Sequence, residues 1–87
     1  MPFVYVVRCV DGTFYTGWTL DLDARVKAHN AGVGARYTRF RRPVTLHYWE
    51  SAQTQSLALR REAVVRRLSH MAKEQLADHT GEPAMRR

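Results

Sequence analysis

This sequence has few acidic side chains. One of them, Glu62, lies where a carboxylate could bind a metal ion. It borders the apolar face of a predicted helix and has arginines nearby at positions 60, 61, 66 and 67. A solvated helix position among arginines explains Glu62 at least as well. The other seven of the 8 carboxylates have local explanations in turns, helix starts, a strand end, the last helix or the tail: Asp11, Asp21, Asp23, Glu50, Glu74, Asp78 and Glu82.

The chain is strongly basic, with a net charge of +6 and a pI of about 10.3. So large a positive charge on a small domain favours polyanionic partners, nucleic acid first among them. Charge alone is not specific, because ribosomal proteins and proteins that bind anionic membranes share it.

A carboxylate and arginines on a basic chain are compatible with phosphodiester hydrolysis. That reaction needs an activated water, a cation near the developing charge and a group that stabilises the leaving oxygen. A carboxylate that binds Mg²⁺ or Mn²⁺, an arginine and a proton acceptor can supply these. A single carboxylate does not make a strong metal site, because Mg²⁺ keeps most of its waters.

Cys9 is the only cysteine, which excludes an intrachain disulfide and a cysteine-rich zinc site. We expect it to be a small buried residue in a reducing cytoplasm. No apolar run approaches the ~20 residues that cross a bilayer, and the N-terminus lacks a secretory pattern. The histidines at 47, 70 and 79 are too widely spaced to propose a metal cluster. These features predict a cytoplasmic protein with no membrane partner and no small-molecule cofactor.

The length of 87 residues suits one domain, which we place at residues 1–79, with 80–87 as a disordered basic tail. The domain begins with two strand-like segments, 3–9 and 13–19. A three-residue turn with a left-handed Gly12 would pair Cys9 with Thr13. One face of the sheet would then carry Tyr5, Val7, Tyr15 and Gly17.

Asp21 is placed to cap a helix over residues 22–30, which Gly32 would end. Positions 22, 25, 26 and 29 form one stripe of this helix. A core-facing stripe would normally be apolar throughout, but here two members are Arg25 and His29.

A basic, glycine-containing loop is predicted for residues 32–43, followed by a third strand over 44–50. Its arginines and aromatic residues suit a surface that follows a nucleic-acid backbone, with Tyr37 and Phe40 as stacking groups. A solvated basic loop is the alternative. The candidate nucleic-acid-binding residues are Arg36, Tyr37, Arg39, Arg41 and Arg42.

The longest helix is predicted over residues 53–68, and Ser69 would cap a last helix over 70–79. Arg61 falls inside the apolar face of the longer helix, where the sequence offers no explanation for it. That predicted buried face comprises Leu57, Ala58, Val64, Val65 and Leu68. The order ββαβαα predicts a small α+β domain: a three-stranded sheet, the hairpin plus one strand, flanked by helices.

The hairpin carries Val-Tyr-Val at 4–6 and Tyr-Thr-Gly at 15–17, and Arg25 follows Tyr15 by ten residues. With Glu62 on the later helix, this set resembles the GIY-YIG nuclease superfamily, and Gly17 matches the glycine that closes the second motif. The resemblance is closer still to short stand-alone bacterial members, and it covers roughly residues 3–76. The matching strings are residues 5–19, 24–30, 35–44 and 58–62. Each is weak by itself, but together and in this order they form a strong signal.

The resemblance implies a metal-dependent endonuclease that uses Mg²⁺ or Mn²⁺. By position, Glu62 would be the only protein ligand of the metal, and Arg25 would stabilise the phosphate charge in the transition state. Tyr15 would activate the water, a role that requires the metal and Arg25 to favour the phenolate, because a free phenol has a pKa of ~10. Tyr5 would position a water or the phosphate, and His29 could assist proton transfer.

Repair-type members have a lysine at the position that Trp18 occupies here. The resemblance therefore leaves open which residue would make the phosphate contact of that lysine. The resemblance favours DNA over RNA and a role in repair or recombination. Little area is available for base readout, so we expect selection by structure. The alternatives are a nucleic-acid-binding module that lost activity and an interaction domain of a larger complex. The oligomeric state is left open.

Overall fold

The hairpin forms as the sequence predicts, in a computed structural model that describes residues 1–79. Strand β1 (Phe3–Arg8) pairs antiparallel with β2 (Phe14–Thr19). The turn has Gly12 at φ 85°, and the Cys9 N–H donates to the Thr13 carbonyl at 2.8 Å. The predicted basic tail at 80–87 lies outside the described residues.

The third strand, β3 (Thr45–Ser51), pairs antiparallel with the other side of β1, so the sheet has the order β2-β1-β3. It begins one residue later than predicted. Val44, the residue before it, is buried, and its N–H donates to the Asn30 side chain at 2.7 Å. The central position of β1 makes its side chains the core of the domain.

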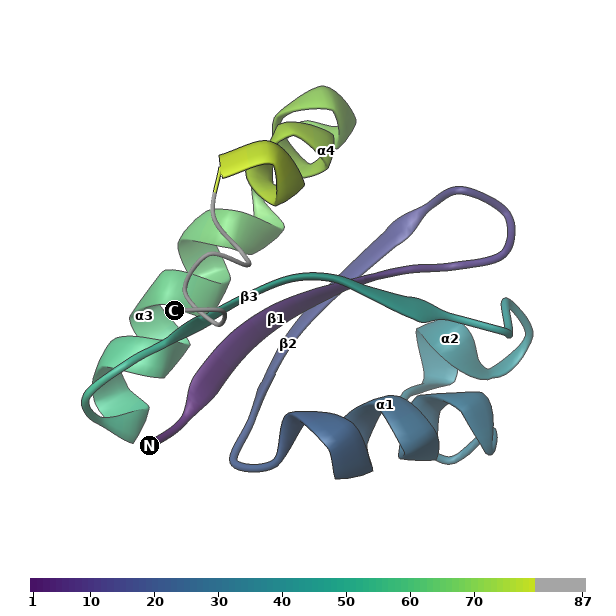
Figure 1. Ribbon diagram of the computed structural model, residues 1–87, viewed down its shortest axis with the longest axis horizontal. Coiled ribbons are helices and arrows are strands. Elements are labelled where there is room, and N and C mark those ends of the chain that lie inside the picture. The colour runs from purple at the N-terminus through teal and green to yellow at the C-terminus, as the bar shows by residue number, and fades with distance from the viewer. Residues whose placement is uncertain (80–87) are drawn as a thin grey trace.

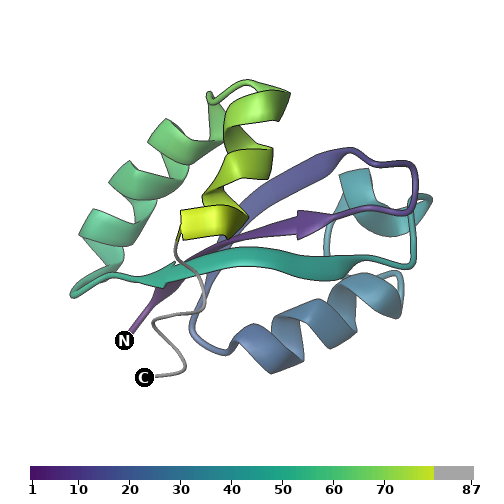
Figure 2. The same ribbon diagram turned by 45° about the horizontal axis from the view of Figure 1, so that its top comes forward.

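Helices cover both faces of the sheet (Figure 1). On one side lie α1 (Leu22–Asn30) and the single turn α2 (Arg36–Arg39); on the other lie α3 (Gln55–Arg66) and α4 (His70–His79). Figure 2 shows α3 and α4 above the sheet and α1 beneath it. None of the helices in residues 1–79 has the length and apolar character that a membrane crossing requires.

Each face of the sheet has its own apolar core. The residues of β1 alternate between the two cores because side chains of a strand point to opposite faces. The core beside α3 and α4 contains Val4, Val6, Phe14, Tyr48, Ala58 and Val65. The core beside α1 contains Tyr5, Val7, Cys9 and Val44, with Leu22 and Val26 packed against it.

Two predictions about the helices are wrong. The basic segment 32–43 is not a simple loop, because it contains α2. Helix α3 buries a narrower stripe than predicted: Leu57 and Val64 are 44% and 50% exposed. The reason is that Ala58 and Val65 alone lie directly against the sheet, with Leu68 partly buried beside them.

Arg61, for which the sequence offered no explanation, has a clear structural role. Its Nε donates to the Glu50 carboxylate at 2.7 Å, and the Tyr48 hydroxyl donates to the other oxygen of the same carboxylate. Burial raises the pKa of Tyr48 to about 12, and its bond to Glu50 adds to the shift. Arg61 therefore ties α3 to β3 and does not belong to the buried stripe.

Candidate active site

Tyr5 lies at the centre of a buried hydrogen-bond network on the α1 side of the sheet. Its side chain is 1% exposed, and its hydroxyl lies 2.8 Å from Nε2 of His29. Nε of Arg25 donates to the same hydroxyl at 3.2 Å. The Asp21 side chain caps α1 through the Ala24 N–H at 3.1 Å, and this places Arg25 and His29 one turn apart facing β1.

The network specifies one arrangement of protons. Nδ1 of His29 lies 2.7 Å from the Thr38 hydroxyl oxygen, and that hydroxyl donates to the Ala35 carbonyl at 3.2 Å. A hydroxyl has one hydrogen, so Thr38 must accept from the Nδ1–H of His29. Nε2 is then the unprotonated nitrogen and accepts the Tyr5 hydroxyl hydrogen. Burial lowers the pKa of His29 to about 4, and the charge of Arg25 contributes, so the imidazole is neutral near pH 7.

Arg25 is held in place by a strand and by a loop. Besides its bond to Tyr5, its Nη2 donates to the Gly34 carbonyl at 2.8 Å. The hydrogen bond to Tyr5 raises the pKa of Arg25, and Tyr15 adds to the rise. The guanidinium is therefore a fixed positive charge beside the Tyr5 hydroxyl.

Two glycines make this packing possible by close approach. A Cβ at Gly17 would lie 2.6 Å from the Tyr5 hydroxyl oxygen. A Cβ at Gly34 would lie 2.5 Å from Nδ1 of His29. Both distances are well inside van der Waals contact, so the network as it stands requires glycine at both positions. The sequence motif includes Gly17, but Gly34 was missed.

Tyr15 adjoins this network from β2 and is only half-buried. Its ring packs edge-on against His29 with 5.3 Å between centroids, and it stacks on Tyr37 at 6.1 Å. The guanidinium of Arg41 lies 4.0 Å over the Tyr37 ring and is fixed by an ion pair with Asp11 at 3.1 Å. Tyr37 therefore supports Tyr15 from α2.

Glu62 reaches the same region from α3. Its side chain is 13% exposed and forms an ion pair with Arg66, one turn later on the helix. Burial raises the pKa of the Tyr5 hydroxyl; Arg25 lowers it, and the nearby charges of Tyr15 and Glu62 raise it. Glu62 is thus close enough to act on the network electrostatically. Among the side chains of residues 1–76, no three His, Cys, Asp or Glu gather into a metal cluster.

Four elements contribute the five predicted site residues: Tyr5, Arg25 and His29 are joined by hydrogen bonds, Tyr15 packs against His29, and Glu62 acts on Tyr5 through its charge. The family model of the GIY-YIG catalytic domain matches residues 1–75. The chain belongs to the GIY-YIG catalytic domain family.

Relatives of this GIY-YIG chain include proteins of the UPF0213 group. The chain is 54% identical over 76 residues to the UPF0213 protein of Halobacterium salinarum, covering 87% of this chain and 99% of that one. It is 49% identical over 74 residues to a Staphylococcus aureus UPF0213 protein, covering 85% and 90%.

Two solved structures share the fold. The solution NMR structure of the UPF0213 protein of Bacillus halodurans has a TM-score of 0.58 at 42% identity, covering 97% of this chain and 90% of that one. An NMR structure from E. faecalis has a TM-score of 0.57 at 43% identity, covering 84% and 78%.

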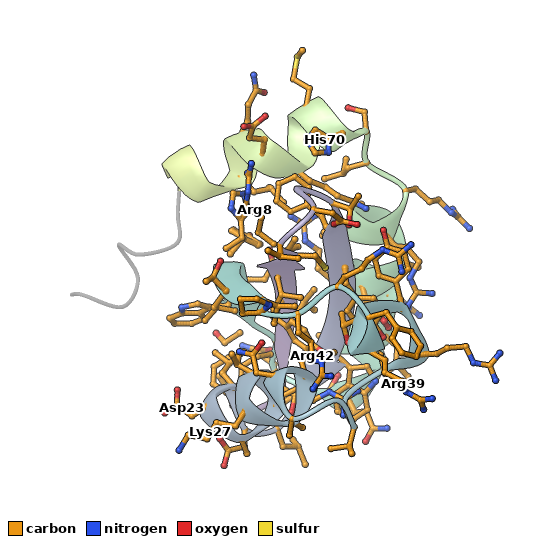
Figure 3. The ribbon with its side chains drawn as sticks, turned by 90° about the vertical axis from the view of Figure 1, so that its right-hand side faces the viewer. Arg8, Asp23, Lys27, Arg39, Arg42 and His70 are labelled. Carbon is orange, nitrogen blue, oxygen red and sulfur yellow. The ribbon has the colours of Figure 1, made fainter. Side chains whose placement is uncertain are left out.

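The basic segment of this GIY-YIG domain is less free than its sequence suggests. Arg42 donates from Nε to the Arg39 carbonyl at 2.8 Å and from Nη1 to the Asn30 carbonyl at 3.2 Å. Figure 3 shows Arg42 over α1, with Arg39 beside it. Phe40 is 84% exposed, with the guanidinium of Arg39 5.9 Å from its ring centroid.

The predicted binding residues thus divide into two groups. Tyr37, Arg41 and Arg42 are engaged in contacts that stabilise the domain. Arg36 and Arg39 are exposed and form no ion pair with another residue of the described part of the chain. Trp18, at the position of the missing lysine, packs against the core beside α3, so it has a structural role.

Proposed function

We propose that this GIY-YIG protein is a divalent-metal-dependent endonuclease that cuts nucleic acid, DNA in preference to RNA. The observation that carries the proposal is the hydrogen bond from Arg25 to the Tyr5 hydroxyl, in a network that Tyr15 adjoins from β2. Three separate elements build this arrangement around a buried network, which a solvated basic surface would not require. We further propose that the protein acts in the cytoplasm on structured intermediates of repair or recombination.

The residues present fit a hydrated metal ion. Glu62 would hold it as the one carboxylate of the site, and Mg²⁺ or Mn²⁺ suits such a site because these ions keep several waters. A zinc site would need additional nitrogen or sulfur ligands, which the described side chains, those of residues 1–76, do not gather in one place. When bound, the ion would supply positive charge that stabilises the phosphate and activates water.

The two tyrosines have different roles in this proposal. The Tyr5 hydroxyl is committed to His29 and Arg25 and is closed to solvent. Tyr15 is half-buried and lines a pocket at the edge of β2, where water and substrate have access. We therefore assign to Tyr15 the removal of a proton from the attacking water, and to Tyr5 the positioning of Arg25.

Arg25 stabilises the charge that accumulates on the phosphate. Its guanidinium is anchored at Nε and Nη2, so it is already oriented before substrate binds. His29 is fully buried, with both ring nitrogens engaged. A positioning role, through Tyr5, suits it better than the proton transfer that the sequence suggested.

Substrate binding rests on charge more than on base contacts. The net charge of +6 and the exposed Arg36 and Arg39 favour contacts with phosphates. Phosphate contacts carry no sequence information. We therefore expect a panel of substrates with one branched structure and varied sequences to be cut at similar rates.

The test is metal-dependent nicking of branched and single-stranded DNA and RNA by the wild type and Glu62→Gln, purified identically. Glu74→Gln removes an exposed carboxylate on α4 and serves as the matched control. We expect cleavage by the wild type and the control only, with Mn²⁺ affinity lost in Glu62→Gln. Equal cleavage by all three proteins would contradict the metal site. Binding without cleavage by any of them would favour an inactive binding module.

A further inference from the structure

A small pocket lies at the edge of β2 beside Tyr15, and the mechanism above assigns a role there to Tyr15 alone. It has a volume of about 190 Å³. Pockets for small-molecule ligands typically measure roughly 300–1,000 Å³, so this space suits a single group such as a phosphate and not a whole nucleotide. Its lining residues are Phe14, Tyr15, Thr16, Tyr37, Arg66 and Lys73.

Two cationic side chains from different helices meet at this pocket. Arg66 ends α3 and Lys73 lies in α4. Burial lowers the pKa of Lys73, and the positive charge of Arg66 lowers it further, so the two cations are close neighbours. Among the side chains of residues 1–76, Lys73 has no carboxylate partner, and Arg66 pairs with Glu62 alone. Such a pair of cations is stabilised by an anion between them.

Thr16, which has a buried hydroxyl, is one of the residues that line the same pocket. Thr16 is 3% exposed, and its Oγ1 forms no hydrogen bond with any other residue of the described chain. A buried polar atom without a partner costs free energy, so such atoms in folded proteins usually have an explanation. An anion held by Lys73 and Arg66 would accept a hydrogen bond from this hydroxyl.

From these three observations we infer that the pocket binds one backbone phosphate of the nucleic-acid strand, adjacent to the phosphate that is cut. The inference rests on the proposed function for its substrate class. Tyr15 belongs both to the pocket and to the catalytic network, so a strand that places one phosphate at Arg25 can place its neighbour at Lys73. If Glu62 binds the metal ion, its ion pair with Arg66 is released. Arg66 can then contact the phosphate together with Lys73.

The chain contains two lysines, which provide a matched comparison. Lys27 lies on the outer side of α1, at the opposite end of the view from α4 (Figure 3). The experiment measures binding of a short single-stranded DNA in EDTA across a salt series, for wild type, Lys73→Gln, Lys73→Arg and Lys27→Gln. Each DNA is used with a 5′-hydroxyl and with a 5′-phosphate, which separates an internal phosphate from a terminal one.

We expect Lys73→Gln to bind several-fold more weakly and to reduce the slope of log K against log salt by about one. Lys73→Arg should bind nearly as well as the wild type, and Lys27→Gln should match it with either DNA end. Equal affinities of Lys73→Gln and Lys27→Gln would overturn the inference. A Lys73 effect confined to the 5′-phosphorylated DNA would overturn the assignment to an internal phosphate.

Thr16→Val tests the hydroxyl separately. Valine has nearly the same shape, and the Thr16 hydroxyl has no described partner to lose. We expect this variant to be at least as stable as the wild type and to bind DNA more weakly; unchanged affinity would contradict the role of Thr16. Because binding is measured without metal, these outcomes are independent of cleavage. If the protein binds DNA through Lys73 but never cuts it, the endonuclease proposal is refuted and the phosphate site is retained.

Discussion

The hydroxyl of Tyr5 lies 2.8 Å from Nε2 of His29, and the opposite nitrogen of that ring lies 2.7 Å from the Thr38 hydroxyl. Each of these groups can satisfy its neighbour with only one placement of the protons, in which His29 is neutral and protonated at Nδ1. The tyrosine at the centre of the first GIY-YIG motif is therefore oriented by a residue of α2, which is remote from it in sequence.

Protonation of His29 should break this arrangement and lower stability. The pKa of His29 in the folded protein is about 4, below its value of about 6.5 in an unfolded chain. The unfolded state thus binds more protons between these values, so stability is complete above about pH 6.5 and falls as the pH decreases towards 4. We expect a loss of about 2 kcal/mol between pH 6.5 and 5, measured by urea unfolding.

The variant His29→Gln should unfold with a much flatter dependence on pH over the same interval. His70→Gln, which removes an exposed histidine of α4, should keep the dependence of the wild type. Parallel curves for the wild type and His29→Gln would show that His29 does not titrate as its burial requires.

Local patterns predicted some parts of this site and not others. The glycine in the hairpin turn determines the strand register, so the shared face of Tyr5 and Tyr15 could be predicted from a few adjacent residues. The stripe that carries Arg25 and His29 followed from helical spacing. Thr38 has no such signal, because its role arises only when α2 folds back over α1.

Tertiary contacts also create relationships that sequence patterns did not predict. The pocket that unites Arg66 and Lys73 exists because α4 turns back over the sheet beside α3, and no periodicity of either helix predicts that meeting. Tyr37 was predicted to stack on bases, and its ring stacks on Tyr15, a contact that the sequence did not indicate. In both cases the packing creates a contact that residue type and spacing do not predict.

Gly17→Ala should abolish cleavage while preserving most of the fold. The added Cβ would lie 2.6 Å from the Tyr5 hydroxyl oxygen and would displace the ring from Arg25 and His29. We expect cleavage to fall by at least about 100-fold, since a small misplacement of the site costs this much. The measurement is initial cleavage rate, with thermal unfolding recorded in parallel.

Gly12→Ala is the control for this substitution. Gly12 has φ +85°, so alanine there strains the turn, but its Cβ would meet nothing within 4 Å. It should lose about 1–2 kcal/mol of stability and remain active. If the two variants lose activity equally, backbone strain and not the contact with Tyr5 explains the effect.

Arg25→Lys should lower kcat far more than it changes KM. Lysine keeps the positive charge but cannot donate to Tyr5 and the Gly34 carbonyl in the same fixed geometry. The loss expected for a misplaced transition-state donor is roughly 100-fold to 1,000-fold in kcat. Steady-state cleavage kinetics at several substrate concentrations would separate the two constants. A rise in KM with unchanged kcat would place Arg25 in substrate binding alone.

Tyr37→Phe and Tyr37→Ala distinguish support of Tyr15 from contact with nucleic acid. The Tyr37 ring contacts Tyr15 on one side of the site and the Arg41 guanidinium in the segment after α2. Phenylalanine keeps both ring contacts, so Tyr37→Phe should cleave nearly as fast as the wild type. Alanine removes them and frees the Tyr15 ring to turn, so Tyr37→Ala should lose about tenfold or more in kcat while binding DNA with nearly unchanged affinity. If Tyr37→Ala instead weakens DNA binding and leaves kcat intact, Tyr37 contacts the substrate, and the orientation of Tyr15 depends on His29 and its own strand.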